Sequence, residues 1–219
     1  CETLARIGAL CKQYDVIVVS DEIHCDLTKP GTEYIPFASV DDTCRDISVT
    51  CIAPTKTFNL AGLQTAAVYA ENSILHHRMW RQLNTDEVAE PNAFAIQATI
   101  AAFQYGEEWL DELREYVEKN KQYVTEFLQE KIPLIHPVAG EATYLMWLDC
   151  RKITESGRQF AKFIRKTSGL YVSGGNQYGR GGEGFLRVNV ATSKLVVEDG
   201  MQRLYESVDA WLKEEKISK

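Results

Sequence analysis

The sequence predicts an α/β fold, and three observations support this fold class. An amphipathic helical pattern over residues 1–13 leads into the apolar run "VIVV" at 16–19, which is typical of a parallel sheet covered on both faces. Amphipathic helical patterns fill residues 73–130. Beyond Pro133, short strand patterns alternate with helices, which indicates a second, smaller α/β unit.

The first strand is predicted over residues 16–20, and the polar stretch "SDEIHCD" follows it at 20–26. A loop rich in turn formers leads to a second strand, predicted over 47–53, and a third is predicted over 65–70. A parallel crossover needs a dozen or more residues, usually as a helix. The short segment between the second and third strands therefore predicts an antiparallel pair.

The next elements are predicted from apolar periodicity. Residues 73–130 are expected to be helical, with one apolar stripe along a long helix, and Trp80, Trp109 and Trp147 are expected in the core. Further strands are predicted at 144–148, 170–172 and 185–190, and helices near 156–167 and 196–215. Gly179, Gly181 and Gly184 match the dinucleotide-binding spacing, but they run into a strand and not into a helix, so we interpret them as a loop.

Composition excludes several classes of function. A net charge of −7, spread along the chain, argues against nucleic acid as a partner. No apolar run is long enough to span a membrane and no leader pattern opens the chain, so we expect a cytoplasmic protein with no membrane partner. The six cysteines show no zinc-type spacing, so we expect free thiols and no metal site.

Two residues at predicted strand ends suggest chemistry. Lys56 follows the second strand in a segment otherwise without charge. Lysines in loops are mostly solvated, but an amine partly withdrawn from water can form a Schiff base with an aldehyde. Asp21 ends the first strand. It is either a loop-capping acid or a carboxylate that keeps a pyridine nitrogen protonated, whereas Glu22 is expected to point the other way and to be structural.

Four separated segments carry a family resemblance: "VIVVSDEIHCDL", "IAPTKTFNLAGLQTAAVYA", "ATYLMWLD" and "GFLRVNVAT". Together they resemble the second half of a fold-type-I enzyme dependent on pyridoxal phosphate (PLP), in the cystathionine β-lyase branch of the class I/II aminotransferase superfamily. The resemblance implies the end of a large mixed-sheet domain, over residues 1–106 with a helical connection. It also implies a long interdomain helix and a small α/β domain over 107–219.

The resemblance also implies roles for individual residues. Lys56 would hold the cofactor as a Schiff base and act as the catalytic base, and Asp21 would pair with the pyridine nitrogen. Ile23 would pack on the ring, His24 would lie near the phenolic oxygen, and Thr55 would contact the phosphate. Arg187 would bind the substrate α-carboxylate, for which a guanidinium has the right geometry.

The implied activity is β-elimination from a small sulfur-containing amino acid, with a homodimer as the full-length state. Gln64 stands where aspartate-type aminotransferases carry a phosphate-binding arginine, and His24 stands where they carry tyrosine; both favour the lyase branch. An aminotransferase is the alternative enzyme. Because the phosphate loop and the ring-stacking aromatic residue would lie upstream of Cys1, we expect a fragment, and a catalytically incomplete fragment or interaction domain is the alternative of another class.

Overall fold

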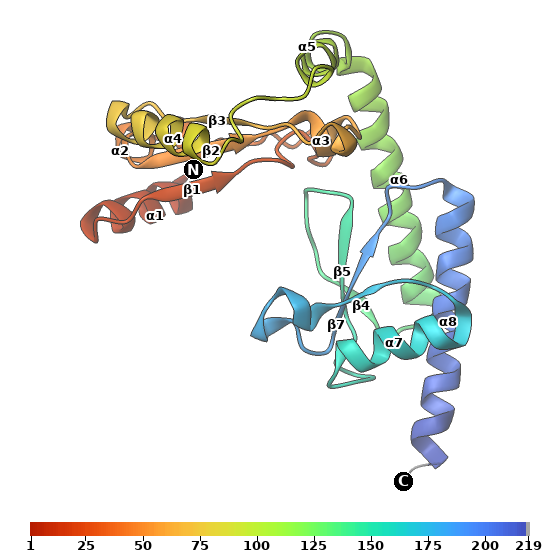
Figure 1. The fold of residues 1–219 in the computed structure, drawn as a ribbon. Coiled ribbons are helices and arrows are strands. Elements are labelled where there is room, and N and C mark those ends of the chain that lie inside the picture. The colour runs from red at the N-terminus through yellow and green to blue at the C-terminus, as the bar shows by residue number, and fades with distance from the viewer. Residues whose placement is uncertain (218–219) are drawn as a thin grey trace. The chain divides into compact units, whose positions relative to one another are not determined.

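The computed structural model describes residues 1–217, with side chains as far as Glu214, and it divides into two compact units. The first unit comprises residues 1–112 and the second begins at Leu113. Both are visible in Figure 1, and each is described by itself. Among the described helices, none has the length and apolarity that crossing a bilayer requires.

The first unit is built on a three-stranded sheet of order β1-β2-β3, with β1 Val18–Asp21, β2 Ser48–Ile52 and β3 Ala67–Tyr69. β1 runs parallel to β2, and β3 runs antiparallel to β2, as the short connection predicts. The helices are α1 Glu2–Gln13, α2 Asp42–Asp46, α3 Pro54–Thr57, α4 Ser73–Thr85 and α5 Ala95–Tyr105. Single 3₁₀ turns lie at Phe37–Ser39 and Ala61–Leu63.

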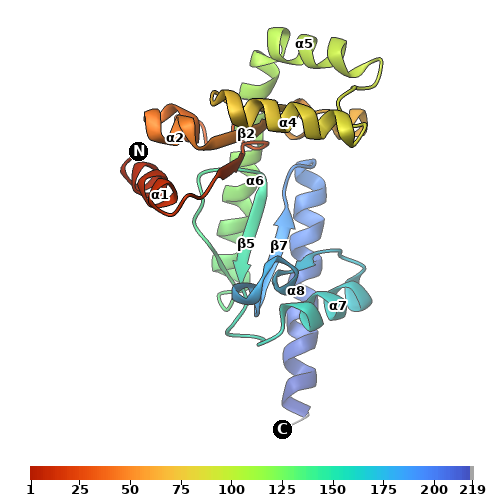
Figure 2. The ribbon, with the colours of Figure 1, turned by 60° about the vertical axis from the view of Figure 1, so that its left-hand side comes forward.

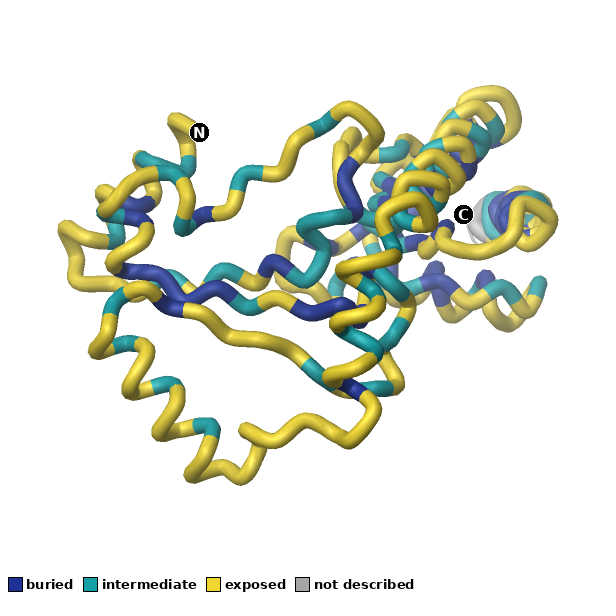
Figure 3. Tube along the Cα trace, turned by 90° about the horizontal axis from the view of Figure 1, so that it is seen from above, coloured by how far each residue is buried: buried dark blue, intermediate teal, exposed yellow. Residues whose placement is uncertain are grey.

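One face of this sheet is covered by a small core. Phe37, Cys44 and Ile47 form its centre, and Val18 of β1 packs against them. The opposite face of β1 is open, since Val19 is 66 % exposed. Figure 3 colours the trace of the chain by burial class. The prediction of a strand covered on both faces is therefore wrong for these residues. The apolar run correctly predicts a strand, but within residues 1–112 only one side of β1 receives a packed layer.

Residues 73–130, predicted to be helical, lie in three helices, and the chain breaks between α4 and α5. Glu87 adopts a left-handed φ of 55°, and Pro91 lacks the N–H that a helix interior needs. α6 Glu107–Lys131 follows directly after Gly106. The core assignment fails for two tryptophans, since Trp80 is 56 % exposed and Trp109 is 45 % exposed. A helical stripe predicts which residues share a face but not what covers that face.

The second unit contains a four-stranded antiparallel sheet of order β4-β5-β7-β6. Its strands are β4 His136–Pro137, β5 Leu145–Asp149, β6 Ser173–Gly174 and β7 Phe185–Asn189, and its helices besides α6 are α7 Gly157–Ser168 and α8 Lys194–Ile217. Two 3₁₀ turns, Gly175–Tyr178 and Arg180–Gly182, lie between β6 and β7. The strand predicted over 170–172 begins at Ser173 instead, because Leu170–Val172 form the connection that leaves α7.

Alternation along β5 and β7 separates a core face from an open face. Met146 and Leu148 of β5, with Leu186 and Val188 of β7, point into the main core. That core also contains buried side chains of α6, α7 and α8. Figure 2 shows β5 and β7 side by side, with α6 and α8 behind them. The intervening residues of both strands therefore form the open face of this sheet.

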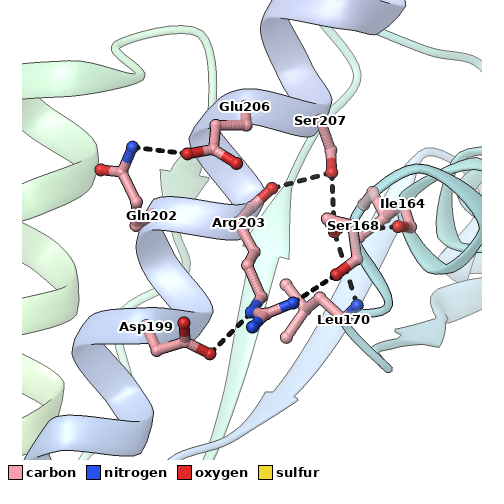
Figure 4. Close-up of polar contacts among 8 residues, drawn as sticks. All are labelled: Ile164, Ser168, Leu170, Asp199, Gln202, Arg203, Glu206 and Ser207. Carbon is pink, nitrogen blue, oxygen red and sulfur yellow. Dashed lines mark hydrogen bonds and ion pairs between the residues drawn. The ribbon is translucent and has the colours of Figure 1, made fainter.

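A polar cluster ties α8 to the end of α7 (Figure 4). Arg203 donates from Nη1 to the carbonyl of Ser168 at 2.6 Å and from Nε to Asp199 Oδ2 at 2.6 Å. The hydroxyl of Ser207 lies 3.0 Å from that of Ser168. A cation at the last carbonyls of a helix is favourable because it opposes the helix dipole. This cluster fixes the point from which the chain continues into β6.

Candidate active site

Parallel pairing brings the two predicted site segments to one edge of the first sheet. Asp21, the last residue of β1, lies opposite Cys51 of β2. The amide of Glu22 continues the ladder by donating to the Cys51 carbonyl at 2.9 Å. After Ala53, β2 leads directly into α3, which contains Lys56. Both segments therefore follow the carboxyl ends of neighbouring parallel strands, where ligands of such sheets bind.

The first segment separates two carboxylates onto opposite faces. Asp21 is exposed, and its Oδ1 accepts a hydrogen bond from the amide of Ile23 at 3.2 Å. Glu22 is only 4 % exposed and accepts from Ser20 Oγ at 2.9 Å and from the amide of Phe37 at 3.1 Å. Glu22 is therefore structural, as expected. The Asp21 carboxylate stays accessible on the open side of the sheet.

The half-buried residues Ile23 and His24 lie in the tight turn that follows. The amide of Cys25 donates to the carbonyl of Glu22 at 2.9 Å, and the amide of Leu27 donates to the carbonyl of His24 at 3.0 Å. These bonds fix the backbone directly after Asp21. The predicted cofactor contacts from this segment thus come from an ordered turn.

The second segment holds Lys56 between two buried threonines. Thr55 is 8 % exposed, Thr57 is fully buried, and Pro54 occupies the first turn of α3, where its missing N–H costs nothing. Lys56 itself is exposed, so the expected withdrawal of its amine from water is not seen within residues 1–217. Among the described residues the amine has no hydrogen-bond or ion-pair partner.

A side-chain hydrogen bond connects the two segments. Thr57 Oγ1 donates to Asp26 Oδ2 at 3.0 Å across 31 residues of sequence. This bond anchors the turn that carries Lys56 to the turn that follows Asp21. Sequence reasoning missed both partners, because nothing in the residues themselves indicates such a long-range pair.

Replacement of Thr57 by valine should measure this connection. The exchange keeps the shape but leaves the half-buried Asp26 carboxylate without this donor, which costs about 1–3 kcal/mol. We expect this loss in the free energy of unfolding of the full-length protein, measured by urea denaturation. Thr57→Ser keeps the hydroxyl and is the matched control; equal stability of the two variants would contradict the assignment.

Two titratable side chains near this edge of the sheet have raised pKa values. Burial, together with the charge of the neighbouring Asp26, raises the pKa of Cys25 to about 11. Burial also raises the pKa of Tyr34 to about 12, with added contributions from the charges of Glu22 and Asp21. Burial is the larger cause in both cases, and nearby carboxylates add to it.

Arg187, the predicted substrate ligand, belongs to the second unit and lies on the open face of its sheet. It is half-buried in β7, opposite Trp147 of β5. Its guanidinium carbon lies 4.2 Å from the centroid of the Tyr178 ring. The placement of Trp147 on this face, not in the core, corrects the sequence prediction. The sequence contained an indication of this placement, because Trp147 alternates along β5 with Met146 and Leu148, which are buried.

The chain is similar to known pyridoxal enzymes in sequence. The family model "Aminotransferase class I and II" matches residues 1–204. The cystathionine beta-lyase PatB of Bacillus subtilis (strain 168) is 40 % identical over 203 residues, which cover 93 % of this chain and 52 % of that protein. The chain thus spans about half the length of the curated relatives it matches.

The chain is also similar in structure to PLP-containing enzymes, and again it covers about half of each. Cystalysin from Treponema denticola, which contains a pyridoxal 5'-phosphate cofactor, matches with a TM-score of 0.90 and 28 % identity, over 94 % of this chain and 52 % of that one. The PLP-bound C-S lyase from Staphylococcus hominis matches with a TM-score of 0.84 and 34 % identity, over 94 % and 54 %.

These matches confirm the predicted fold class. The mixed α/β architecture is that of PLP-dependent aminotransferases and C-S lyases, of which this chain corresponds to about half. The resemblance inferred from the four sequence segments agrees with the family model that covers most of the chain. The chain therefore belongs to the aminotransferase class I and II family.

Proposed function

We propose that the full-length protein is a PLP-dependent carbon–sulfur β-lyase that acts on a small sulfur-containing amino acid such as cystathionine or cysteine. One observation carries this proposal: Asp21 and Lys56 follow the carboxyl ends of two neighbouring parallel strands. Its support from relatives is that PatB, at 40 % identity, is named a cystathionine beta-lyase. The overall reaction breaks the Cβ–S bond, consumes water and yields a thiol, pyruvate and ammonia.

The side chains at the strand ends suit PLP by their chemistry. Lys56 offers an exposed amine for the aldehyde, and Asp21 offers an exposed carboxylate for the ring nitrogen. Thr55, in the first turn of α3, offers a hydroxyl for the phosphate. In this proposal Ile23 packs on the ring, and His24 lies near its phenolic oxygen.

When bound, PLP supplies an electron sink that stabilises negative charge on the substrate α-carbon. The negative charge of Asp21 keeps a proton on the ring nitrogen, because a nearby carboxylate favours the protonated form of a base. The Lys56 amine accepts the α-proton as general base. Arg187 binds the substrate α-carboxylate through paired N–H donors, a geometry that a guanidinium provides and an ammonium does not.

Two positions favour lyase chemistry over transamination, and one of them is His24, which stands where aspartate-type aminotransferases carry tyrosine. Gln64 stands eight residues after Lys56, where aspartate-type aminotransferases carry an arginine. Gln64 has a left-handed φ of 47° at the end of a 3₁₀ turn. An aminotransferase remains the alternative enzyme, since the family includes both reactions. The alternative of another class is a catalytically incomplete fragment or interaction domain.

Product analysis of the full-length protein with added PLP tests the proposal. With cystathionine as substrate, we expect pyruvate and a free thiol to form in equal amounts and without a keto-acid acceptor. Turnover that depends on 2-oxoglutarate and releases no thiol would support the aminotransferase instead. A folded protein that retains no PLP after gel filtration would contradict both enzyme proposals.

The resemblance to fold-type-I enzymes also supports a homodimer for the full-length protein, and we further propose a cytoplasmic location. A monomeric mass of the full-length protein by light scattering would contradict the dimer.

A further inference from the structure

On the open face of the second sheet lies a cation that has no acidic partner within the described part of the chain. Arg187 lies in the middle of β7, paired with Trp147 of β5 on one side and Ser173 of β6 on the other. Its side chain is half-buried. Among the described residues, no carboxylate forms an ion pair with its guanidinium. A partly buried arginine of this kind needs another form of stabilisation.

Tyr178 supplies that stabilisation. The guanidinium carbon of Arg187 lies 4.2 Å from the Tyr178 ring centroid, well inside the distance of about 6 Å for a cation–π interaction. The Tyr178 ring meets Trp147 edge to face, with centroids 5.7 Å apart. Trp147 in turn stacks on Phe185 at 5.5 Å and 17°. Trp147, itself stacked on Phe185, thus supports the ring that contacts the arginine.

The loop that carries Tyr178 is anchored on both sides. Gly175 and Gly182 approach so closely that a Cβ built on Gly175 would lie 2.4 Å from the Gly182 carbonyl oxygen. A Cβ on Gly175 would also lie 2.8 Å from the Trp147 ring. The segment between these glycines contains Tyr178. Its ring is therefore fixed relative to β5 and β7.

We propose that Tyr178 is a positioning residue that holds the Arg187 guanidinium for recognition of the substrate α-carboxylate. Contact with a ring face uses no N–H donor, because the donors of a guanidinium lie in its plane. The in-plane donors stay available for a bidentate carboxylate. This inference rests on the proposed function, and it adds that Tyr178 sets affinity for the carboxylate and takes no part in proton transfer.

Loss of the ring should weaken carboxylate binding selectively. We expect Tyr178→Leu to raise KM for cystathionine about 2- to 30-fold, the range of a cation–π interaction, with kcat and PLP content nearly unchanged. Tyr178→Phe keeps the ring face and should restore the wild-type KM. Tyr171→Leu is the matched control, because Arg165 lies 5.1 Å from the Tyr171 ring in a similar pair elsewhere in this unit.

A binding experiment separates this inference from the proposed function. Alanine has no β leaving group, and ethylamine is alanine without the carboxylate. By calorimetry on the full-length PLP-loaded protein, we expect Tyr178→Leu to weaken alanine binding and to leave ethylamine binding unchanged. The loss should be absent in an Arg187→Met background, since the ring acts through Arg187.

Several results would overturn the inference. One is an equal loss of alanine and ethylamine binding in Tyr178→Leu; another is an unchanged KM in that variant. Wild-type protein that binds alanine no more tightly than ethylamine would also overturn it. If pyruvate release is absent while alanine binding still depends on Tyr178, only the proposed function fails.

Discussion

Replacement of Lys56 by alanine is expected to abolish pyruvate release by the full-length protein, with a loss of about 10³-fold or more in kcat. The expectation follows from the two tasks proposed for one amine, which holds the cofactor aldehyde and removes the α-proton. General acid–base catalysis alone contributes about 10²- to 10⁴-fold. A coupled assay for pyruvate measures the loss.

A loss of activity in this variant should reflect loss of the amine and not loss of the fold. Lys56 is exposed and lacks a partner among the described residues, so its removal should leave the fold intact. Lys56→Arg, which keeps the charge but cannot hold an aldehyde, should be equally inactive. Lys162→Ala removes another exposed lysine, on α7, and should be fully active. Pyruvate release at the wild-type rate by Lys56→Ala would refute the assignment of this residue.

Asp21→Asn should cause the second-largest loss, about 10²- to 10³-fold in kcat, which is typical of removing one preorganised electrostatic partner. The amide is neutral and cannot stabilise a proton on a ring nitrogen. Its carbonyl oxygen can still accept the hydrogen bond from the amide of Ile23. The backbone turn should therefore keep its conformation. The exchange should lower kcat strongly and change the free energy of unfolding little.

The control for this exchange lies before the same strand. Asp15 is exposed and has a left-handed φ of 53°, a conformation that asparagine tolerates. Asp15→Asn removes the same charge at a distance in sequence from the strand end and should keep wild-type activity. If Asp21→Asn retained full kcat with bound PLP, the ring-nitrogen role would be wrong.

Local patterns predicted β1, β2, β3, β5 and β7, but they predicted strand directions only in the first sheet. The apolar run at 16–19 gave a strand, and the short segment after Lys56 gave the antiparallel direction of β3. Such patterns do not show which elements cover each face of a strand. Val19 is apolar yet 66 % exposed, because burial depends on which other elements pack against β1 and not on the strand itself. The break between α4 and α5 was missed because apolar periodicity alone outweighed the signal of Pro91.

The sequence identified some of the candidate site residues but not others. Lys56 and Asp21 stand out because each is a charge directly after an apolar strand, which is a local property. The Asp26–Thr57 hydrogen bond joins residues 31 positions apart, and Tyr178 meets Arg187 only after β6 and β7 pair. Such contacts are products of tertiary structure. Their partners carry no distinguishing feature in the linear chain.

The close approach of Gly175 and Gly182 has a thermodynamic consequence for recognition. Because this contact orders the segment around Tyr178 as the domain folds, the conformational entropy of that segment is lost before any ligand arrives. Association then needs no further immobilisation of backbone, and more of the intrinsic attraction between guanidinium and carboxylate is expressed as affinity. Replacement of either glycine by alanine would break this close approach, and the segment around Tyr178 would then be ordered only when the ligand binds.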